Sequence, residues 1–192
     1  MLYRNYKRDF IQDLADEAIR KRKFGIDPLE LSVTSKVHQT QHLLLPGNVE
    51  CTAYRSSAAV VALGGRIAVS CYVVNDGKAE PVLITDYLYD KLPKDARWFV
   101  RAHEAGHLVN GDLGTAENAI REVASGASPE TISDTRSEWA ENRADDYAVR
   151  FLGRRRALRA MKEIQRMIRE NPWTDFDLDE LQGRMDRIRH VS

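Results

Sequence analysis

The sequence predicts an α+β fold, and three observations lead to that prediction. Apolar residues recur at helical spacing near both ends of the chain, at about residues 3–23 and about residues 153–190. Residues 58–84 are rich in valine and alanine and contain Gly-Gly and Asn-Asp-Gly turn signals, as expected for short strands. Two more amphipathic helical patterns follow, at residues 95–109 and 137–152. A chain of 192 residues is expected to form one domain around a buried core.

The central region predicts three short strands. Ala58–Leu63 and Arg66–Val74 are separated by Gly64-Gly65, which is typical of a tight hairpin turn. Asn75-Asp76-Gly77 then leads to a third strand at Pro81–Ile84. An antiparallel order is the simplest arrangement and gives a small, mainly antiparallel sheet. If one edge of this sheet lies beside the next helix, a peptide can add to it as an extra strand. The alternative is that the three strands only form part of the core.

The net charge and the cysteine count of the chain restrict the partners and the cellular compartment that we expect for it. Lysine plus arginine and aspartate plus glutamate number 29 each, so the net charge of zero gives no attraction to nucleic acid or to an anionic membrane. We therefore expect neither as a partner. Two cysteines exclude a disulfide framework and suit a reducing compartment. Residues 1–9 lack the apolar core of a signal peptide, and residues 58–74 are too short to span a bilayer, so a cytoplasmic protein is expected.

The most informative motif is H-E-x-x-H, formed by His103, Glu104 and His107. Two histidines at i and i+4 lie on one face of a helix, where both imidazoles can reach one zinc ion at about 2.0–2.1 Å. Glu104 is rotated by about 100° around the helix from His103, which places a carboxylate beside the metal. Asp95 can cap the start of this helix and Asn110-Gly111 can end it. The alternative is a surface helix whose histidines contact only solvent.

A zinc site with two histidines needs a third protein ligand, and the second helical pattern offers carboxylates for this role. Glu141 is the expected ligand, and Glu138, one turn earlier, is its competitor. Asp145, one turn after Glu141, can hold a ligand histidine through its other ring nitrogen. The alternative for Asp145 is a salt bridge to Arg143 or Arg101.

Weaker candidates each have a simpler structural explanation. His38 and His42 also stand at i and i+4, and they form either a second metal site or an exposed pair. The arginine-rich segment Arg154–Arg169 follows an acidic stretch, which favours a solvated or ion-paired face over anion binding. Tyr147 lies on the apolar stripe of its predicted helix, where an aromatic ring is core more often than a donor to an oxyanion.

Cys51 and Cys71 have two interpretations. Either thiol could cap the zinc in a latent form of the protein. A buried cysteine that packs as a small apolar side chain is the favoured interpretation for both.

From Ile84 to Phe151 the chain resembles the gluzincin metallopeptidases, in particular the M48-like type and its small soluble relatives, the minigluzincins. The segment Ala102–Asp112 is similar to that family's A-H-E-x-G-H-x-x-N-G-D/H, and Glu141–Asp145 to its E-x-x-A-D. Residues 184–188 resemble its closing R-I-x-x-L segment loosely, without the histidine-proline pair usual just before it. Repressor-cleaving metallopeptidases, which share H-E-x-x-H and a downstream glutamate helix, are a weaker resemblance.

The resemblance implies a zincin-like fold in which His103, His107 and Glu141 bind Zn²⁺, Glu104 is the base and Asp145 supports the site. The function expected from the motif and the resemblance together is a zinc-dependent endopeptidase acting on a peptide or protein substrate. Zinc would polarise the scissile carbonyl and lower the pKa of a water whose proton Glu104 takes. The alternative is a regulatory protein that keeps this fold and holds a partner with weak or no proteolysis.

Overall fold

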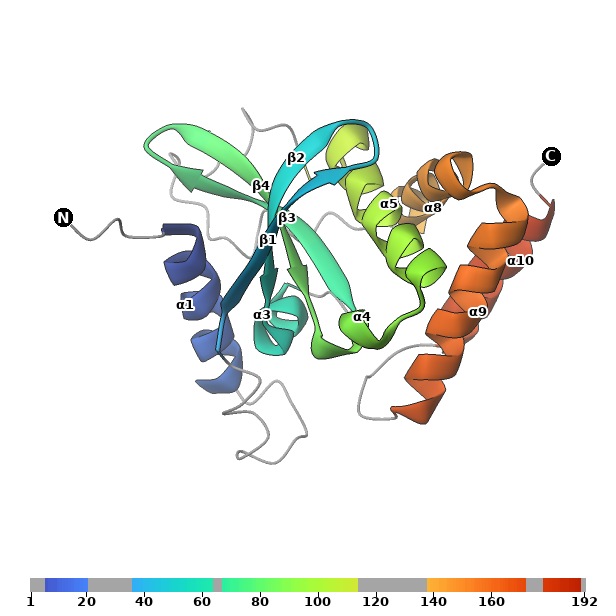
Figure 1. Ribbon diagram of the computed structural model, residues 1–192, viewed down its shortest axis with the longest axis horizontal. Coiled ribbons are helices and arrows are strands. Elements are labelled where there is room, and N and C mark those ends of the chain that lie inside the picture. The colour runs from blue at the N-terminus through green and yellow to red at the C-terminus, as the bar shows by residue number, and fades with distance from the viewer. Residues whose placement is uncertain (1–5, 21–35, 64–66, 114–137, 172–177, 191–192) are drawn as a thin grey trace.

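The computed structural model describes residues 6–20, 36–63, 67–113, 138–171 and 178–190. Within these residues the chain forms four strands and seven helices (Figure 1). The strands are β1 (His38–Leu45), β2 (Val49–Arg55), β3 (Ala68–Asn75) and β4 (Lys78–Thr85). The helices are α1 (Tyr6–Arg20), α3 (Ser57–Ala62), α4 (Tyr87–Lys91), α5 (Lys94–Asn110), α8 (Glu138–Leu152), α9 (Arg154–Glu170) and α10 (Leu178–His190).

The four strands make one mixed sheet in the order β1-β2-β4-β3. The β1–β2 and β3–β4 pairs are antiparallel, whereas β2 and β4 are parallel. The α+β class is therefore confirmed, and two of the three strand pairs are antiparallel, as a mainly antiparallel sheet requires. The expected set of three strands is wrong, because the described sheet has four strands and its central pair is parallel. In the described part of the chain β1 and β3 are the two edges.

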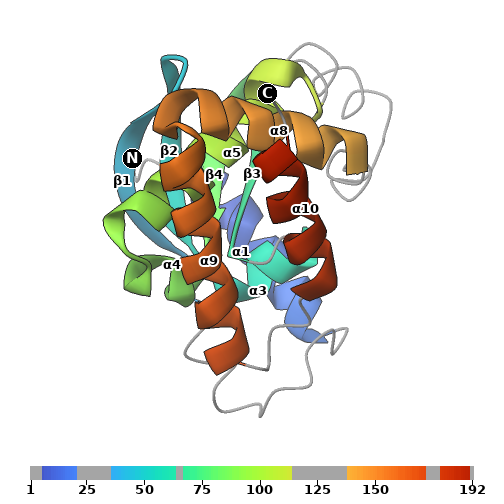
Figure 2. The ribbon, with the colours of Figure 1, turned by 90° about the vertical axis from the view of Figure 1, so that its right-hand side faces the viewer.

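The sheet separates two hydrophobic cores. Side chains alternate between the two faces of a strand, so Leu83 packs into one core while its neighbours Val82 and Ile84 pack into the other. Helices α1 and α3 cover the second face, and α5 lies on the first, with α8 and α9 packed on α5 and α10 packed on α8 and α9 (Figures 1 and 2). Burial on both faces explains why the central strand β4 ends in a continuous apolar run rather than an alternating pattern.

The segment predicted as the first strand is instead the helix α3. A short apolar run without polar residues has no readable period, so a strand and a buried helix look alike in sequence. Ser56 decides the outcome locally: its carbonyl accepts from the Val60 N–H at 3.1 Å, and its Oγ accepts from the Ala59 N–H at 3.3 Å. Ala58, Ala59 and Val60 are then buried against α1, and this burial stabilises the helical conformation.

The hairpin formed by β1 and β2 is not among the predicted strands. Most of β1 is exposed, so its sequence lacks the apolar alternation by which a strand is identified. The turn between the strands uses Gly47 at φ 84° and Asn48 at φ 61°, both in the left-handed region. Pro46-Gly47-Asn48 is the turn signal that could have indicated this hairpin.

The terminal helices agree with their predictions where the structure describes them. Helix α1 buries Ile11, Leu14, Ala15 and Ala18, while α10 buries Leu181, Met185 and Ile188. Residues 21–23 of the predicted first helix lie outside the described residues, as does the predicted Gly64-Gly65 turn. Among the described helices, none has the length and apolar character that a membrane crossing requires.

Candidate metal centre

Helix α5 carries the H-E-x-x-H motif, and its two ends are set by local sequence. Pro93 occupies the position before the first turn, so the expected cap by Asp95 is wrong. Asp95, in the first turn of α5, instead pairs with Arg156 of α9 at 2.7 Å. The expected end of the helix is confirmed, since Gly111 adopts φ 71° and its N–H donates to the carbonyl of His107.

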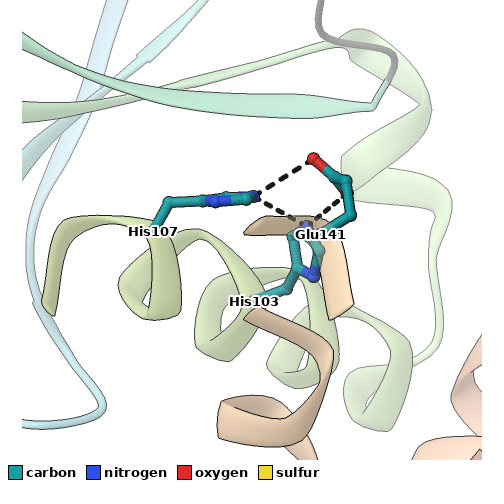
Figure 3. A group of neighbouring side chains, drawn as sticks. All are labelled: His103, His107 and Glu141. Atoms are coloured by element: carbon teal, nitrogen blue, oxygen red, sulfur yellow. Dashed lines mark hydrogen bonds and ion pairs between the residues drawn. The ribbon is translucent and has the colours of Figure 1, made fainter. Parts of the chain in front are cut away.

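Helices α5 and α8 bring His103, His107 and Glu141 together. The Nε2 atoms of the two histidines are 3.1 Å apart. Glu141 faces both imidazoles, with Oε2 3.2 Å from Nε2 of His103 and Oε1 3.3 Å from Nε2 of His107. Figure 3 shows the three side chains converging on one point, the histidines from α5 and the glutamate from α8. His107 is fully buried, and both partners are largely so.

This triangle fits a metal ion of tetrahedral preference. A regular tetrahedron with metal–ligand bonds of about 2.1 Å has edges of about 3.4 Å. The two Nε2 atoms are 3.1 Å apart, and each of them lies 3.2–3.3 Å from a different oxygen of the Glu141 carboxylate, so all of these separations are close to that length. In the described residues this is the group of histidine, cysteine, aspartate and glutamate side chains that can hold a metal ion. Three protein ligands leave a fourth tetrahedral position for a water or a substrate atom.

Each histidine is held from behind by a carboxylate. Nδ1 of His103 lies 2.9 Å from Oδ1 of Asp145, and Nδ1 of His107 lies 3.3 Å from Oδ2 of Asp112. A histidine that binds a metal through Nε2 carries its proton on Nδ1, so both rings can donate to these acceptors. Asp145 is fully buried, and the ligand histidine that it contacts is His103.

The role of Asp112 was missed in the sequence. Gly111 in the left-handed conformation turns the chain back at the end of α5, so that the N–H of Asp112 donates to the carbonyl of His107 at 3.0 Å. That turn places the carboxylate of Asp112 under the ring of His107. The Gly-Asp pair directly after the expected helix end was the available signal.

Arg184 of α10 closes the site from a third helix. Its Nε and Nη2 form a fork with the two oxygens of Asp145 at 2.8 and 2.7 Å, and its Nη1 lies 3.0 Å from Oε2 of Glu141. The alternative partners considered for Asp145 are wrong: Arg143 packs over Trp139, and Arg101 donates to Tyr89. No local sequence pattern predicts that Arg184 contacts Asp145. Arg184 does belong to residues 184–188, the segment that loosely resembles the closing motif of the family.

The charges around the triangle perturb each other strongly. Burial disfavours a charged imidazole at His103, yet the carboxylates of Glu141 and Asp145 outweigh it and raise the His103 pKa to about 9. Burial also opposes ionisation of Asp145, but Arg184 and His103 lower its pKa to about 2. The pKa of Glu141 is lowered far below its ordinary value because His103 and Arg184 overcome the effect of burial. The pocket therefore stabilises a cation at the place where the three ligand atoms meet.

Glu104 is buried beside this centre and contacts the edge strand β3. Its Oε2 accepts from the backbone N–H of Ser70 at 2.7 Å and lies 2.8 Å from the Ser70 hydroxyl. The same hydroxyl lies 3.1 Å from the backbone carbonyl of Glu104. The carboxylate of the expected base is therefore held by a strand that comes from a distant part of the chain.

The remaining candidates lie away from the metal centre. Glu138, the competitor of Glu141, is exposed at the start of α8. Tyr147 donates to the carbonyl of Pro46 at 3.1 Å and thus holds the β1–β2 turn against α8. His38 and His42 lie on a strand, where four residues span about 13 Å, so they cannot share one metal ion in the manner of a helical pair.

The cysteines and the arginine-rich segment also have structural explanations. Cys51 and Cys71 form no disulfide and are buried in different cores, as expected for cysteines that pack as small side chains. On α9, Arg156 pairs with Asp95, and Arg166 lies between Glu163 and Glu170. This agrees with the expectation of an ion-paired face.

No protein-family model, curated protein or solved structure matches this chain. The function is accordingly inferred from the side chains of the metal centre and their surroundings.

Proposed function

We propose that this protein is a zinc-dependent endopeptidase with a zincin-like fold of the gluzincin type. The observation that carries the proposal is the His103–His107–Glu141 triangle, with a buried glutamate next in sequence to one of the ligands. Two imidazoles and one carboxylate are the ligand set of catalytic zinc in peptidases of this kind. A structural zinc site would use a fourth protein ligand, and the described residues bring three to this point.

Zinc suits these donors better than the hard cations do. Calcium and magnesium prefer oxygen ligands, whereas two of the three donors here are imidazole nitrogens. When bound, zinc would supply Lewis acidity that polarises a carbonyl and lowers the pKa of a water toward 7. Glu141 contributes one negative charge to the site, and Arg184 keeps it ionised and oriented.

Glu104 is the proposed general base. It takes the proton of the attacking water and then gives it to the nitrogen of the leaving amine, so that one carboxylate serves both halves of the reaction. Glu104 lies next to the ligand His103 on α5, and two contacts from Ser70 hold its carboxylate. Asp145 and Asp112 hold the two histidine rings in the tautomer that leaves Nε2 available.

The edge strand β3 supports an extended peptide as the substrate. The N–H of Ser70 points away from β4, since it donates to Glu104, and strand N–H groups alternate in direction. The N–H groups of Tyr72 and Val74 therefore face the same edge as that of Ser70. A substrate strand added here would pair with Tyr72 and Val74 rather than with Ser70, whose N–H already has an acceptor.

The test begins with metal content. Wild type, Glu141→Ala and Glu138→Ala are purified and loaded with zinc, and elemental analysis gives the zinc bound per chain. We expect one zinc per chain in wild type and in Glu138→Ala, an exposed acid on the same helix, and much less in Glu141→Ala. Zinc content that is equal in all three variants would contradict the assignment of Glu141.

The second half of the test is hydrolysis of a library of internally quenched peptides. Glu104→Gln should keep its zinc and lose peptide cleavage, whereas His103→Ala should lose both. Proteolysis retained by zinc-loaded Glu104→Gln would contradict the role of Glu104. A zinc-loaded wild type that cleaves no peptide would favour the alternative of a protein that holds a partner.

A further inference from the structure

Ser70 contacts the proposed base Glu104 from the sheet. It lies 34 residues before Glu104 in sequence and is fully buried, on the edge strand β3. Its backbone N–H donates to Oε2 of Glu104 at 2.7 Å, and its hydroxyl reaches the same oxygen at 2.8 Å. Two short bonds from one residue to the same carboxylate oxygen occupy about half of the acceptor sites of a carboxylate and fix that oxygen relative to the strand.

The hydroxyl of Ser70 also bridges the two ends of the Glu104 residue. It lies 3.1 Å from the backbone carbonyl of Glu104 and 2.8 Å from the carboxylate. A glutamate side chain loses up to about 2 kcal/mol of rotamer freedom when it is fixed in one arrangement. Contacts at both ends of the side chain impose that restriction before any substrate binds, which is the preorganisation that a general base requires.

We propose that Ser70 is a positioning residue that holds the Glu104 carboxylate in the orientation needed for proton transfer. This inference rests on the proposed function, since it assigns Ser70 a part in the same reaction. Ser70 acts through Glu104 and does not bind the metal. Ser70 lies on β3, the strand proposed to pair with the substrate, and it contacts Glu104, the proposed base. The same strand would therefore position the substrate and the base relative to each other.

The experiment compares Ser70→Ala with Ser70→Thr and with Thr85→Val. Thr85 is a matched control because it is a buried hydroxyl in the same sheet, and its bond goes to the carbonyl of Tyr54 instead of to Glu104. Each zinc-loaded protein is assayed for kcat and KM on the internally quenched peptide that wild type cleaves fastest. Melting temperature and zinc content are measured on the same samples.

We expect Ser70→Ala to lower kcat by about 10- to 100-fold while KM stays within about twofold of wild type, because the base is misplaced and the binding edge is intact. Ser70→Thr should recover most of the loss, and Thr85→Val should keep both constants within about twofold. All three should hold one zinc per chain.

Three outcomes would overturn the role of Ser70. They are an unchanged kcat in folded, zinc-loaded Ser70→Ala, a change in KM alone, and a folded Ser70→Thr that recovers nothing. These differ from failure of the proposed function, in which wild type itself cleaves no more peptide than Glu104→Gln. That result would remove the reaction and, with it, the role assigned to Ser70.

Discussion

Gly106 of α5 and Ala144 of α8 touch backbone to backbone. A Cβ atom added to Gly106 would lie 2.8 Å from the Cα of Ala144 and 3.2 Å from its carbonyl oxygen. Gly106 follows His103 by three residues, and Ala144 follows Glu141 by three, so this contact lies about one turn from the ligands on each helix. The small residues at this contact set how closely the two ligand-bearing helices approach.

Gly106→Ala is expected to separate the helices and weaken metal binding. Backbone cannot yield as a flexible side chain can, so the added methyl group should cost about 1–3 kcal/mol of folding free energy. Zinc affinity should fall by at least about tenfold because the ligands move apart. The measurements are urea denaturation of the metal-free protein and competition for zinc with a chromophoric chelator.

Gly183→Ala on α10 is the matched control for this change. Nothing lies within 4 Å of a Cβ added at Gly183. The same substitution there should leave zinc affinity unchanged and stabilise the helix by about 0.5–1 kcal/mol. Equal zinc affinities for the two alanine variants would contradict the proposed role of the Gly106 contact.

Arg184→Met should destabilise the metal-free protein strongly. The substitution leaves the carboxylates of Asp145 and Glu141 buried without the guanidinium that pairs with both. Breaking a buried ion pair by removing one partner costs about 3–5 kcal/mol. Bound zinc should reduce this cost, because a cation then faces Glu141 from the other side. Chemical denaturation with and without zinc measures the difference.

Arg166→Met provides the comparison on an exposed surface. Arg166 also contacts two acids, Glu163 and Glu170, but its side chain is 57% exposed. Its loss should change the free energy of unfolding by no more than about 0.5 kcal/mol. A loss of similar size for both arginines would mean that Arg184 does not stabilise the buried carboxylates.

Zinc affinity should rise with pH up to about pH 9. The pKa of His103 is raised from 6.5 to about 9, so below that pH a proton competes with the metal for the imidazole. Release of one proton predicts an increase of roughly tenfold in affinity per pH unit between pH 7 and pH 9. Calorimetry in buffers of different ionisation enthalpy counts the protons released. A pH-independent affinity in this range would contradict the prediction.

The same pKa shift has the opposite consequence for the metal-free fold. A histidine whose pKa is raised on folding stabilises the protein fully below pH 6.5, and this stabilisation is lost as pH rises through about 9. Thermal melting of the metal-free protein should therefore show a falling midpoint from pH 7 to pH 9. The zinc-bound protein should not show this loss.

Asp86→Asn should stabilise the protein at neutral pH relative to wild type. Burial raises the pKa of Asp86 to about 6, so the charged carboxylate that caps α4 at pH 7 is disfavoured by its surroundings. In wild type the N–H of Leu88 donates to Oδ1 of Asp86 at 2.6 Å, and the side-chain oxygen of asparagine can accept the same hydrogen bond. Because the folded pKa lies above the unfolded one, wild type gains stability as pH falls from about 6 to 3.8.

Comparison of melting temperatures over that pH range checks the prediction. The advantage of Asp86→Asn should shrink as pH falls below 6, since wild type then also carries a neutral side chain. Asp86→Ala, which removes the cap, should be less stable than Asp86→Asn by about 1 kcal/mol at every pH, since neither side chain titrates. An Asn variant that is less stable than wild type at pH 7 would contradict burial as the dominant effect on Asp86.

Local patterns were sufficient for much of the candidate site. The histidines one turn apart on α5 follow from helical spacing alone, and their burial follows from the apolar residues around them. The second amphipathic helix, with carboxylates one turn apart, predicts Glu141 and Asp145. The structure brings Glu141 to the two imidazoles and Asp145 to Nδ1 of His103, so these placements agree with the expectation.

By itself, the sequence determined the α+β class, the helical ends of the chain and the β3 and β4 strands, because helix and strand periodicity are properties of short segments. It also indicated five side chains of the candidate site, which are His103, Glu104, His107, Glu141 and Asp145. Only the tertiary structure decided the rest. Segment 57–62 is helical because α1 buries it, and β1, with little apolar alternation, is a strand because β2 pairs with it. Ser70 and Arg184 reach the site from 34 and 39 residues away from their partners, through packing that no local pattern encodes.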